Sequence, residues 1–312
     1  MPNPPIVGRI DVHQHLWPAE LLEALRARRS GPRLDGWTLH LPGEPPFPVT
    51  PQDHDLDACL AREAGTGLAL VSLSSPLGIE DLHPDDAAPL LDAWHVGAAR
   101  LPAPFGAWAA VSRLDPDPGA LKDRLTGGFV GLQVPATWLA TPARLEEFAP
   151  VLAVCEAASA PVLVHPGPVA ATDERESLPG WWPAVVDYPA QLQAAWWAWH
   201  AAGRSLLPTL RIGFVAGAGL AAGHHERLRA RGGSVGRVDA DVFVETSSYG
   251  PQGLDVLVRA LGIDVVVAGS DRPYAEPADL AAPPFNLGTA AANAVDVVNP
   301  HRFLYGITGG AS

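Results

Sequence analysis

The sequence predicts an α/β fold: a (β/α)8 TIM barrel with an insertion after strand 1 and a long connection after strand 5. Eight short apolar, β-rich runs recur along the 312 residues. Segments of helical character separate these runs, which favours parallel strands joined by right-handed crossovers. The runs are almost continuously apolar, which is typical of a sheet covered on both faces. A doubly wound sheet is the structural alternative.

The expected strands are short stretches rich in Val, Ile, Leu and Phe, and most are flanked by Gly, Pro or Asp. In chain order they cover 6–15, 67–74, 105–112, 128–134, 161–167, 211–217, 241–248 and 264–271. The expected helices have Ala- and Leu-rich sequences with helical spacing of apolar residues. They cover 56–65, 85–100, 117–126, 143–159, 191–203 and 253–262.

Two connections are too long for simple crossovers. Residues 17–55 follow the first strand and contain many prolines, and residues 166–200 follow the fifth strand and contain five tryptophans. In a barrel both leave from the C-terminal rim, where enzymes of this fold keep their active sites. No repeat or linker divides the chain. We therefore expect one domain over 1–312, with 17–55 as an insertion or lid.

Bulk composition argues against several classes of partner. The net charge of −13 and the pI near 5.2 do not fit a nucleic-acid-binding protein, which needs clustered Lys and Arg. No apolar run reaches the roughly 18 to 20 residues of a membrane span, and the first residues do not resemble a signal peptide. We expect a cytoplasmic protein with no membrane partner, in which Cys59 and Cys155 are buried, reduced thiols.

Polar residues capable of binding a metal stand at the ends of three predicted strands. His13 and His15 alternate along the first strand and project to the same side. His165 ends the fifth strand, and Asp271 ends the eighth. Neutral imidazoles and a carboxylate suit Zn²⁺, Mn²⁺ or Fe²⁺ and leave a position for water or substrate. For any single histidine, a hydrogen-bonded strand end is the alternative, but the four together predict a divalent-metal site.

These residues resemble the amidohydrolase superfamily, and more closely its aminocarboxymuconate semialdehyde decarboxylase-like branch, amidohydrolase family 2. The resemblance extends from Ile10 to Tyr305 and is weakest in 17–55. Beyond the His-x-His start, it is carried by VLVHPGP (162–168), LPGWWPAVVDYPAQ (178–191), SLLPTLRIGF (205–214), GSDRP (269–273) and NPHRFLYG (299–306).

The resemblance implies a site and an activity. His13, His15, His165 and Asp271 would bind one divalent metal ion, with Zn²⁺ expected and Mn²⁺ or Fe²⁺ as alternatives, and Asp271 would also move protons. The branch implies decarboxylation of a small aromatic or unsaturated carboxylic acid, and it commonly forms homodimers. Hydrolysis of an ester, lactone or amide is the alternative, because the same four ligands serve either mechanism.

The sequence departs from the family pattern on the sixth strand. The family has a catalytic or metal-binding histidine there, and this chain has Ala216, whose methyl group can neither bind metal nor transfer a proton. His224 or His225 could replace it as a catalytic residue, although a solvated helix terminus is the simpler expectation for each. Otherwise Asp271 acts unaided, or the barrel binds a metal or a partner without catalysis.

Four residues are expected to contact substrate. Arg33, in the insertion with Arg28 and Arg29, could clamp a carboxylate through two hydrogen bonds, and Trp181 and Trp182 could form an aromatic wall. Arg272 stands beside Asp271 and could contact substrate or neutralise local charge. The alternatives are surface exposure for the arginines of the insertion and burial against a neighbouring subunit for the tryptophans.

One further motif suggests a different class of function. The stretch GAGLAA at 217–222 follows a strand-like run and fits the Gly-rich turn of dinucleotide-binding folds, with acidic residues about twenty positions on at Asp239, Asp241 and Glu245. The motif is short in a chain with 31 glycines. A dinucleotide fold would also leave the strand-end histidines without a role, so nucleotide binding is the weakest of the four hypotheses.

Overall fold

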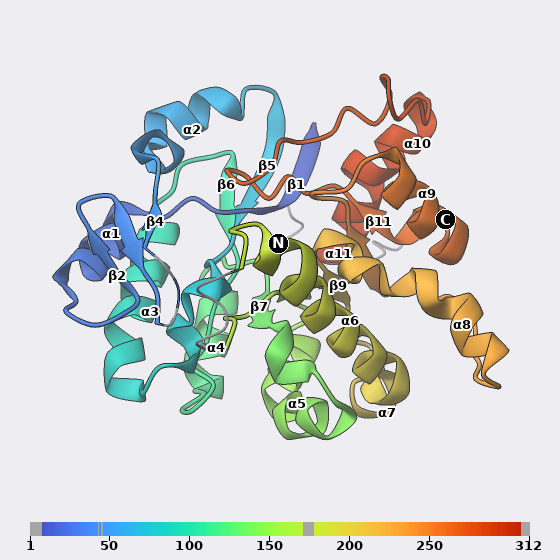
Figure 1. Ribbon diagram of the computed structural model, residues 1–312, viewed down its shortest axis with the longest axis horizontal. Coiled ribbons are helices and arrows are strands. Elements are labelled where there is room, and N and C mark those ends of the chain that lie inside the picture. The colour runs from blue at the N-terminus through green and yellow to red at the C-terminus, as the bar shows by residue number, and fades with distance from the viewer. Residues whose placement is uncertain (1–7, 43, 45, 171–177, 307–312) are drawn as a thin grey trace.

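A computed structural model describes residues 8–42, 44, 46–170 and 178–306 (Figure 1). Eight parallel strands form two sheets. The first sheet has the order β1 (Arg9–Gln14), β5 (Thr66–Val71), β6 (Phe105–Ala107). The second runs from β11 (Val266–Val267) through β10 (Val242–Glu245), β9 (Ile212–Phe214) and β8 (Val162–His165) to β7 (Leu132–Pro135).

Single bridges join the edges of the two sheets. Gln14 pairs with Arg272 beyond β11, and Ala109 beyond β6 pairs with Leu132. Backbone hydrogen bonds support both junctions, including Val12 N–H to the Ala268 carbonyl at 3.0 Å and Ala109 N–H to the Gly131 carbonyl at 2.8 Å. The eight strands therefore follow one another around a ring, and the predicted TIM barrel is confirmed.

Helices between the strands cover the outside of the sheets. They are α2 (Leu56–Arg62), α3 (Pro84–Ala98), α4 (Pro118–Thr126), α5 (Pro142–Ala157), α6 (Tyr188–Ala198), α7 (Arg204–Leu206), α8 (His225–Ala230), α9 (Pro251–Leu261), α10 (Thr289–Asn293) and α11 (Asn299–Tyr305). Side chains of Asp55, Asp117 and Thr141 cap three of them by accepting a backbone N–H. All six predicted helical segments are confirmed. In the described residues, no helix combines the length and apolarity that a membrane span requires.

The insertion after β1 has structure of its own. It contains α1 (Ala19–Ala27), an antiparallel sheet of β2 (Arg33–Asp35), β3 (Thr38–His40) and β4 (Phe47–Pro48), and a 3₁₀ turn over Pro51–His54. The sequence predicts an insertion here but not this sheet, because strands of two or three residues are too short to show a period-two pattern.

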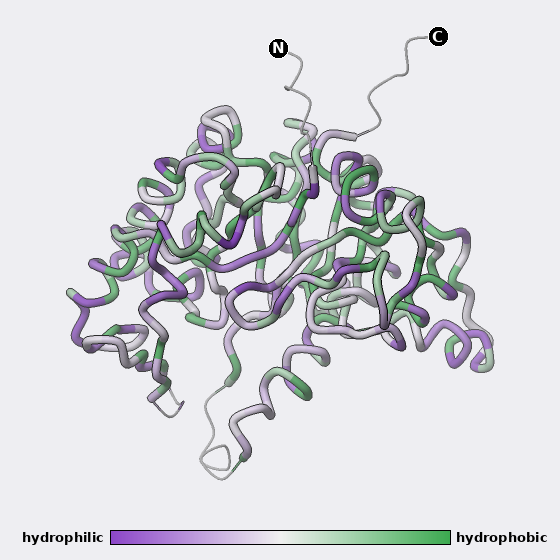
Figure 2. Tube along the Cα trace, turned by 90° about the horizontal axis from the view of Figure 1, so that it is seen from above, coloured by the Kyte–Doolittle hydropathy of each residue, from purple (hydrophilic) through white to green (hydrophobic). Residues whose placement is uncertain are grey.

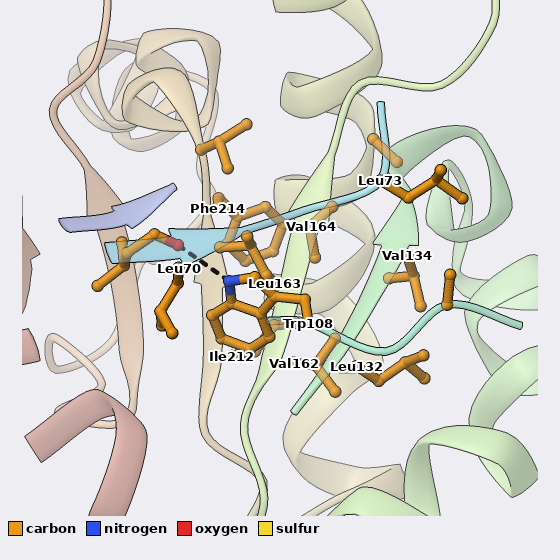
Figure 3. Close-up of a cluster of buried hydrophobic side chains, with 14 of the residues drawn as sticks. Leu70, Leu73, Trp108, Leu132, Val134, Val162, Leu163, Val164, Ile212 and Phe214 are labelled. Carbon is orange, nitrogen blue, oxygen red and sulfur yellow. Dashed lines mark hydrogen bonds between the residues drawn. The ribbon is translucent and has the colours of Figure 1, made fainter. Parts of the chain in front are cut away.

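Apolar side chains of the strands fill the interior (Figure 3). Trp108 is fully buried and donates its indole N–H to the Val12 carbonyl at 2.9 Å, which satisfies the polar atom inside the core. Figure 2 shows hydrophobic segments along the interior strands and hydrophilic ones on outlying coils. A rigid core of this kind fixes the strand ends, and therefore any side chains that project from them.

The chain leaves β9 through a left-handed turn. Ala216 to Leu220 have φ between 45° and 57°, and Ala218 and Leu220 are not glycine. Left-handed backbone costs an L-residue about 1–2 kcal/mol, so packing must maintain it. At Gly219, an added Cβ would lie 2.5 Å from the Pro189 carbonyl oxygen. The GAGLAA motif thus forms a tight exit from a barrel strand and not the turn of a dinucleotide-binding fold, the hypothesis that the sequence ranks weakest.

Candidate metal centre

Four side chains from three strand ends converge at one rim of the barrel. His13 and His15 come from β1 and the residue after it, His165 from the end of β8, and Asp271 from the loop after β11. Nε2 of His15 lies 3.1 Å from Nε2 of His13, 3.2 Å from Nε2 of His165 and 3.3 Å from Oδ1 of Asp271. All four candidate ligand atoms lie within 4.8 Å of one another.

Each imidazole has its other nitrogen next to an oxygen. Nδ1 of His13 is 3.3 Å from Oε2 of Glu245, and Nδ1 of His165 is 2.8 Å from the Pro166 carbonyl. Nδ1 of His15 is 3.1 Å from the Ser72 carbonyl. These carbonyl and carboxylate oxygens only accept hydrogen bonds, so each ring carries its proton on Nδ1. The three Nε2 lone pairs consequently point at one another.

This arrangement fits a bound cation. The facing lone pairs of His15 and its two neighbours, at 3.1 and 3.2 Å, repel one another unless positive charge lies between them. Tetrahedral coordination with metal–nitrogen distances near 2.1 Å would place ligand atoms about 3.4 Å apart. The three separations from Nε2 of His15 and the one between His13 and Asp271 are 3.1–3.6 Å, close to that value. The four residues present therefore fit a divalent metal ion.

The surroundings shift the pKa values of His165 and His13 in opposite directions. Burial, together with the adjacent imidazoles of His15 and His13, lowers the pKa of His165 well below its usual value. Burial also disfavours the charged form of His13, but the hydrogen bond with Glu245 and the charge of Asp271 raise the pKa of His13 overall. The two carboxylates thus flank the His13 ring, Glu245 at Nδ1 and Asp271 at Nε2, and their negative charge favours a bound cation.

Asp271 differs from the three histidines in its solvent exposure and in its backbone conformation. Its side chain is 21% exposed, whereas the histidine residues are at most 6% exposed. Its φ of 60° lies in the left-handed region, which aspartate tolerates better than most residues and which often marks functional sites. Tyr274, three residues after Asp271 in the chain, has its ring 5.7 Å from that of His15.

Glu245 at the end of β10 is a site residue that the sequence interpretation missed. It is fully buried and contacts His13 from behind. From the sequence, Glu245 was a candidate only as the acidic residue of the nucleotide hypothesis. A carboxylate at the C-terminal end of a predicted barrel strand was the available signal, since His13, His165 and Asp271 were identified by the same criterion.

Arg272, predicted to contact substrate, belongs to a buried polar network. Its Nη1 donates to Oε1 of Glu63 at 2.6 Å, and its Nε donates to Oε2 of Glu276 at 3.1 Å. Glu63 also accepts from Gln14 at 3.1 Å, and Gln14 in turn donates to Asp11. These ion pairs agree with the neutralisation of local charge that was the alternative considered for Arg272, and its contact with substrate stays a prediction.

The insertion reaches the cluster through an aromatic stack. The His54 ring lies between those of Trp17, at 4.3 Å, and Trp37, at 6.4 Å, with almost parallel planes. Burial lowers the pKa of His54 to about 4, which keeps the ring neutral. The Trp17 indole donates to Oγ of Ser74 at 2.9 Å, and that hydroxyl is 3.2 Å from Nδ1 of His15.

The structure does not bring His224 or His225 to the cluster. His224 is exposed, and His225 packs against the rings of Trp196 and Trp197. Helix α8, which begins at His225, lies at the periphery of the molecule (Figure 1). The left-handed turn sends the chain over α6 rather than back over the barrel mouth. The expectation that either histidine replaces the imidazole missing at Ala216 is therefore corrected.

The remaining predicted substrate contacts lie on the long connections. Trp181 is 55% exposed and stacks on Trp182 with ring centroids 5.8 Å apart, just before α6. Arg33 on β2 pairs with exposed Asp35 at 3.4 Å. The hydrogen bonds, ion pairs and ring contacts of Trp181, Trp182 and Arg33 in the described residues do not involve the four clustered residues. Their assignment to substrate binding stays a prediction.

No family model and no curated protein matches the sequence. Solved structures do. 5-Carboxyvanillate decarboxylase from Sphingomonas paucimobilis is 17% identical, with a TM-score of 0.76 over 96% of this chain and 99% of that one. The Metarhizium anisopliae IDCase in apo form is 18% identical, with a TM-score of 0.75 over 95% and 97%.

A third neighbour was solved with a metal. Dihydroxybenzoic acid decarboxylase from a Polaromonas species, with bound manganese and the inhibitor 2-nitroresorcinol, is 17% identical, with a TM-score of 0.67 over 96% of this chain and 97% of that one. At this level of identity the likeness concerns architecture. The chain therefore shares the TIM-barrel fold of these solved structures.

Proposed function

We propose that this protein is a metal-dependent decarboxylase of the amidohydrolase superfamily that acts on a small aromatic or unsaturated carboxylic acid. The observation that carries the proposal is the convergence of three Nε2 lone pairs and the Asp271 carboxylate, with every Nδ1 engaged by an oxygen. The choice of decarboxylation rests on the fold shared with enzymes that are named for this reaction.

His13, His15, His165 and Asp271 would hold one divalent ion. When bound, the ion supplies Lewis-acid polarisation of a substrate oxygen. We propose Zn²⁺ as the resident ion, with Mn²⁺ and Fe²⁺ as alternatives. The histidine-rich ligand set supports Zn²⁺, and the manganese in solved neighbours supports Mn²⁺. Elemental analysis of protein purified without chelator tests the assignment, and less than about one equivalent of any transition metal would contradict it.

Asp271 is positioned to move the proton that decarboxylation requires. Breaking the bond between the carboxylate carbon and the ring releases CO₂ and leaves an electron pair on the ring carbon, which must take up one proton. Among the four clustered residues, Asp271 has the most exposed side chain. Its carboxyl group can therefore reach both the cluster and a substrate, and deliver a proton to that carbon.

We also propose that residues 17–55 act as a lid within a single domain. The stack of Trp17, His54 and Trp37 and the bond of Trp17 to Ser74 support this role, because they tie the insertion to a neighbour of His15. The proposal includes a cytoplasmic homodimer, for which exposed Trp181 offers an apolar contact. Light scattering would test the assembly, and a monomer at assay concentrations would contradict it.

Product analysis tests the reaction. A panel of hydroxybenzoates labelled in the carboxyl carbon should yield labelled CO₂ with the wild-type enzyme and none with the His13→Ala/His165→Ala double variant. Incorporation of solvent oxygen into ester, lactone or amide substrates without loss of carbon would instead indicate a hydrolase. Metal binding without turnover on either panel would favour the non-catalytic barrel, which Ala216 and the peripheral His225 make a specific alternative.

A further inference from the structure

We infer that Glu245 is the positioning residue that orients His13 for metal binding, within a carboxylate pocket shared by four barrel strands. The inference rests on the proposed function, because it takes the four clustered residues to be a metal centre. It adds a residue that does not touch the ion or the substrate and that acts through the imidazole of His13.

The carboxylate of Glu245 is enclosed by hydrogen-bond donors. Its Oε2 lies 3.3 Å from Nδ1 of His13, 3.0 Å from the backbone nitrogen of Ala216 and 2.7 Å from Oγ of Ser247. Its Oε1 accepts the backbone N–H of Ser247. Glu245 is 0% exposed, and within the described residues its recorded salt bridge is to His13. A buried carboxylate with this many donors stays in one orientation.

This contact determines which nitrogen of His13 faces the cluster. A carboxylate accepts a hydrogen bond from Nδ1–H, so the proton stays on Nδ1 and the lone pair stays on Nε2. Nε2 is the atom that lies 3.1 Å from Nε2 of His15 and 3.6 Å from Oδ1 of Asp271. Carboxylate–histidine pairs of this kind fix the ring and raise its basicity as a metal ligand.

Gly269 makes room for the carboxylate. A Cβ at this position would lie 2.4 Å from Oε1 of Glu245 and 2.5 Å from both Cδ and Cγ, far inside contact distance. Gly269 stands two residues before Asp271, on the segment that follows β11. Glu245 therefore packs against the backbone leading to one ligand while it bonds the ring of another.

The residue at the exit from β9, Ala216, completes the pocket around the Glu245 carboxylate. Ala216, with φ of 45°, directs its backbone N–H to Glu245, and its side chain is a single methyl group. The pocket thus joins His13 on β1, Ala216 after β9, Glu245 on β10 and Gly269 after β11. A purely structural role would require only that Glu245 satisfy Ala216 and Ser247, and it would leave metal affinity unchanged.

Metal affinity in variants separates the two roles. We would measure Co²⁺ binding by chelator competition and by the visible absorption of the bound ion. Glu245→Gln should weaken binding by about 10- to 100-fold, as loss of an outer partner of a metal ligand typically does, and should alter the absorption spectrum. Glu245→Asp keeps the charge but is one methylene shorter, so it should lose the His13 contact and weaken binding similarly.

Glu80→Gln is the matched control. Glu80 is also a buried glutamate, at 1% exposed, but it bonds Ser75 and none of the four clustered residues. Its variant should bind Co²⁺ like the wild type. Wild-type affinity and spectrum in Glu245→Gln would overturn the inference, and so would an equal loss in Glu80→Gln. If Glu245→Gln does not fold, Glu245→Asp decides by the same criteria. Failure of the wild type itself to bind metal would instead refute the proposed function.

Discussion

Glu80 shows how a single buried carboxylate can couple stability to pH. Its Oε1 accepts a 2.5 Å hydrogen bond from Ser75, whereas its Oε2 is buried and has no hydrogen-bond partner among the described residues. Burial raises the pKa of Glu80 to about 7, and the bond from Ser75 opposes this only in part. The folded state therefore keeps a proton on Glu80 up to a higher pH than the unfolded chain, in which the pKa is near 4.5.

Raising the pH should accordingly lower the free energy of unfolding. The proton on Glu80 contributes about 3 kcal/mol to this free energy; the contribution is fully present below pH 4.5 and is lost as the pH rises to about 7. Glu80→Gln removes this dependence, so the variant should lose less stability than the wild type between pH 5 and pH 8. Urea unfolding at both pH values measures the difference, and parallel losses in the two proteins would contradict the prediction.

Asp271 offers a second prediction at the scale of one residue. Asp271→Asn retains an oxygen that can bind metal but cannot carry a proton. Turnover should fall by about 100-fold or more, whereas metal content should fall much less. Labelled CO₂ release and elemental analysis on the same preparation measure the two quantities. Turnover that falls only in proportion to metal content would mean that Asp271 serves as a ligand alone.

At the scale of an element, the left-handed turn after β9 depends on its glycines. Gly219 has φ of 57°, and an added Cβ would meet the Pro189 backbone at 2.5–3.0 Å. Gly219→Ala should destabilise the protein by about 2–4 kcal/mol, from left-handed strain and the backbone clash together. Thermal unfolding measures this change.

Gly223 provides the control, because it lies in the same 3₁₀ segment, Ala216–His224, but beyond the left-handed turn. An added Cβ there would lie 3.6 Å from a methyl group of Val256, an ordinary contact. Gly223→Ala should change stability by no more than about 0.5 kcal/mol. Equal losses in the two variants would show that the segment tolerates no side chain at any glycine, rather than responding to the turn geometry.

The elements also show which parts of the fold the sequence can predict. Val162 to His165 and Val242 to Glu245 are recognisable because buried parallel strands are continuously apolar. The glycines of 217–222 left a phosphate-binding loop open as the weakest hypothesis, because glycine permits both conformations and packing against Pro189 selects the left-handed turn. Glu245 was overlooked for a similar reason: its contact with His13 joins residues 232 positions apart.

For the whole molecule, removal of the metal should cost stability. With the ion at about 100 times its dissociation constant, binding adds about 2.7 kcal/mol to the folded state. Treatment with a chelator should therefore lower the unfolding midpoint by on the order of 5 °C. The His13→Ala/His165→Ala variant should show no such shift. Identical midpoints for wild-type protein with and without chelator would contradict metal binding.

The ring of strands has two seams, which are the junctions between its two sheets, at Gln14 and Arg272 and at Ala109 and Leu132. The metal cluster spans the first of them. Between β1 and the residues after β11, the junction depends on a few backbone bonds, including Asp271 N–H to the His13 carbonyl at 2.8 Å. His13 and His15 lie on one side of this seam and Asp271 on the other. A bound ion would therefore link the two sides of the seam through its ligands. Amide hydrogen exchange at this seam should therefore quicken in the apo protein, while the seam at Ala109 and Leu132 keeps its protection.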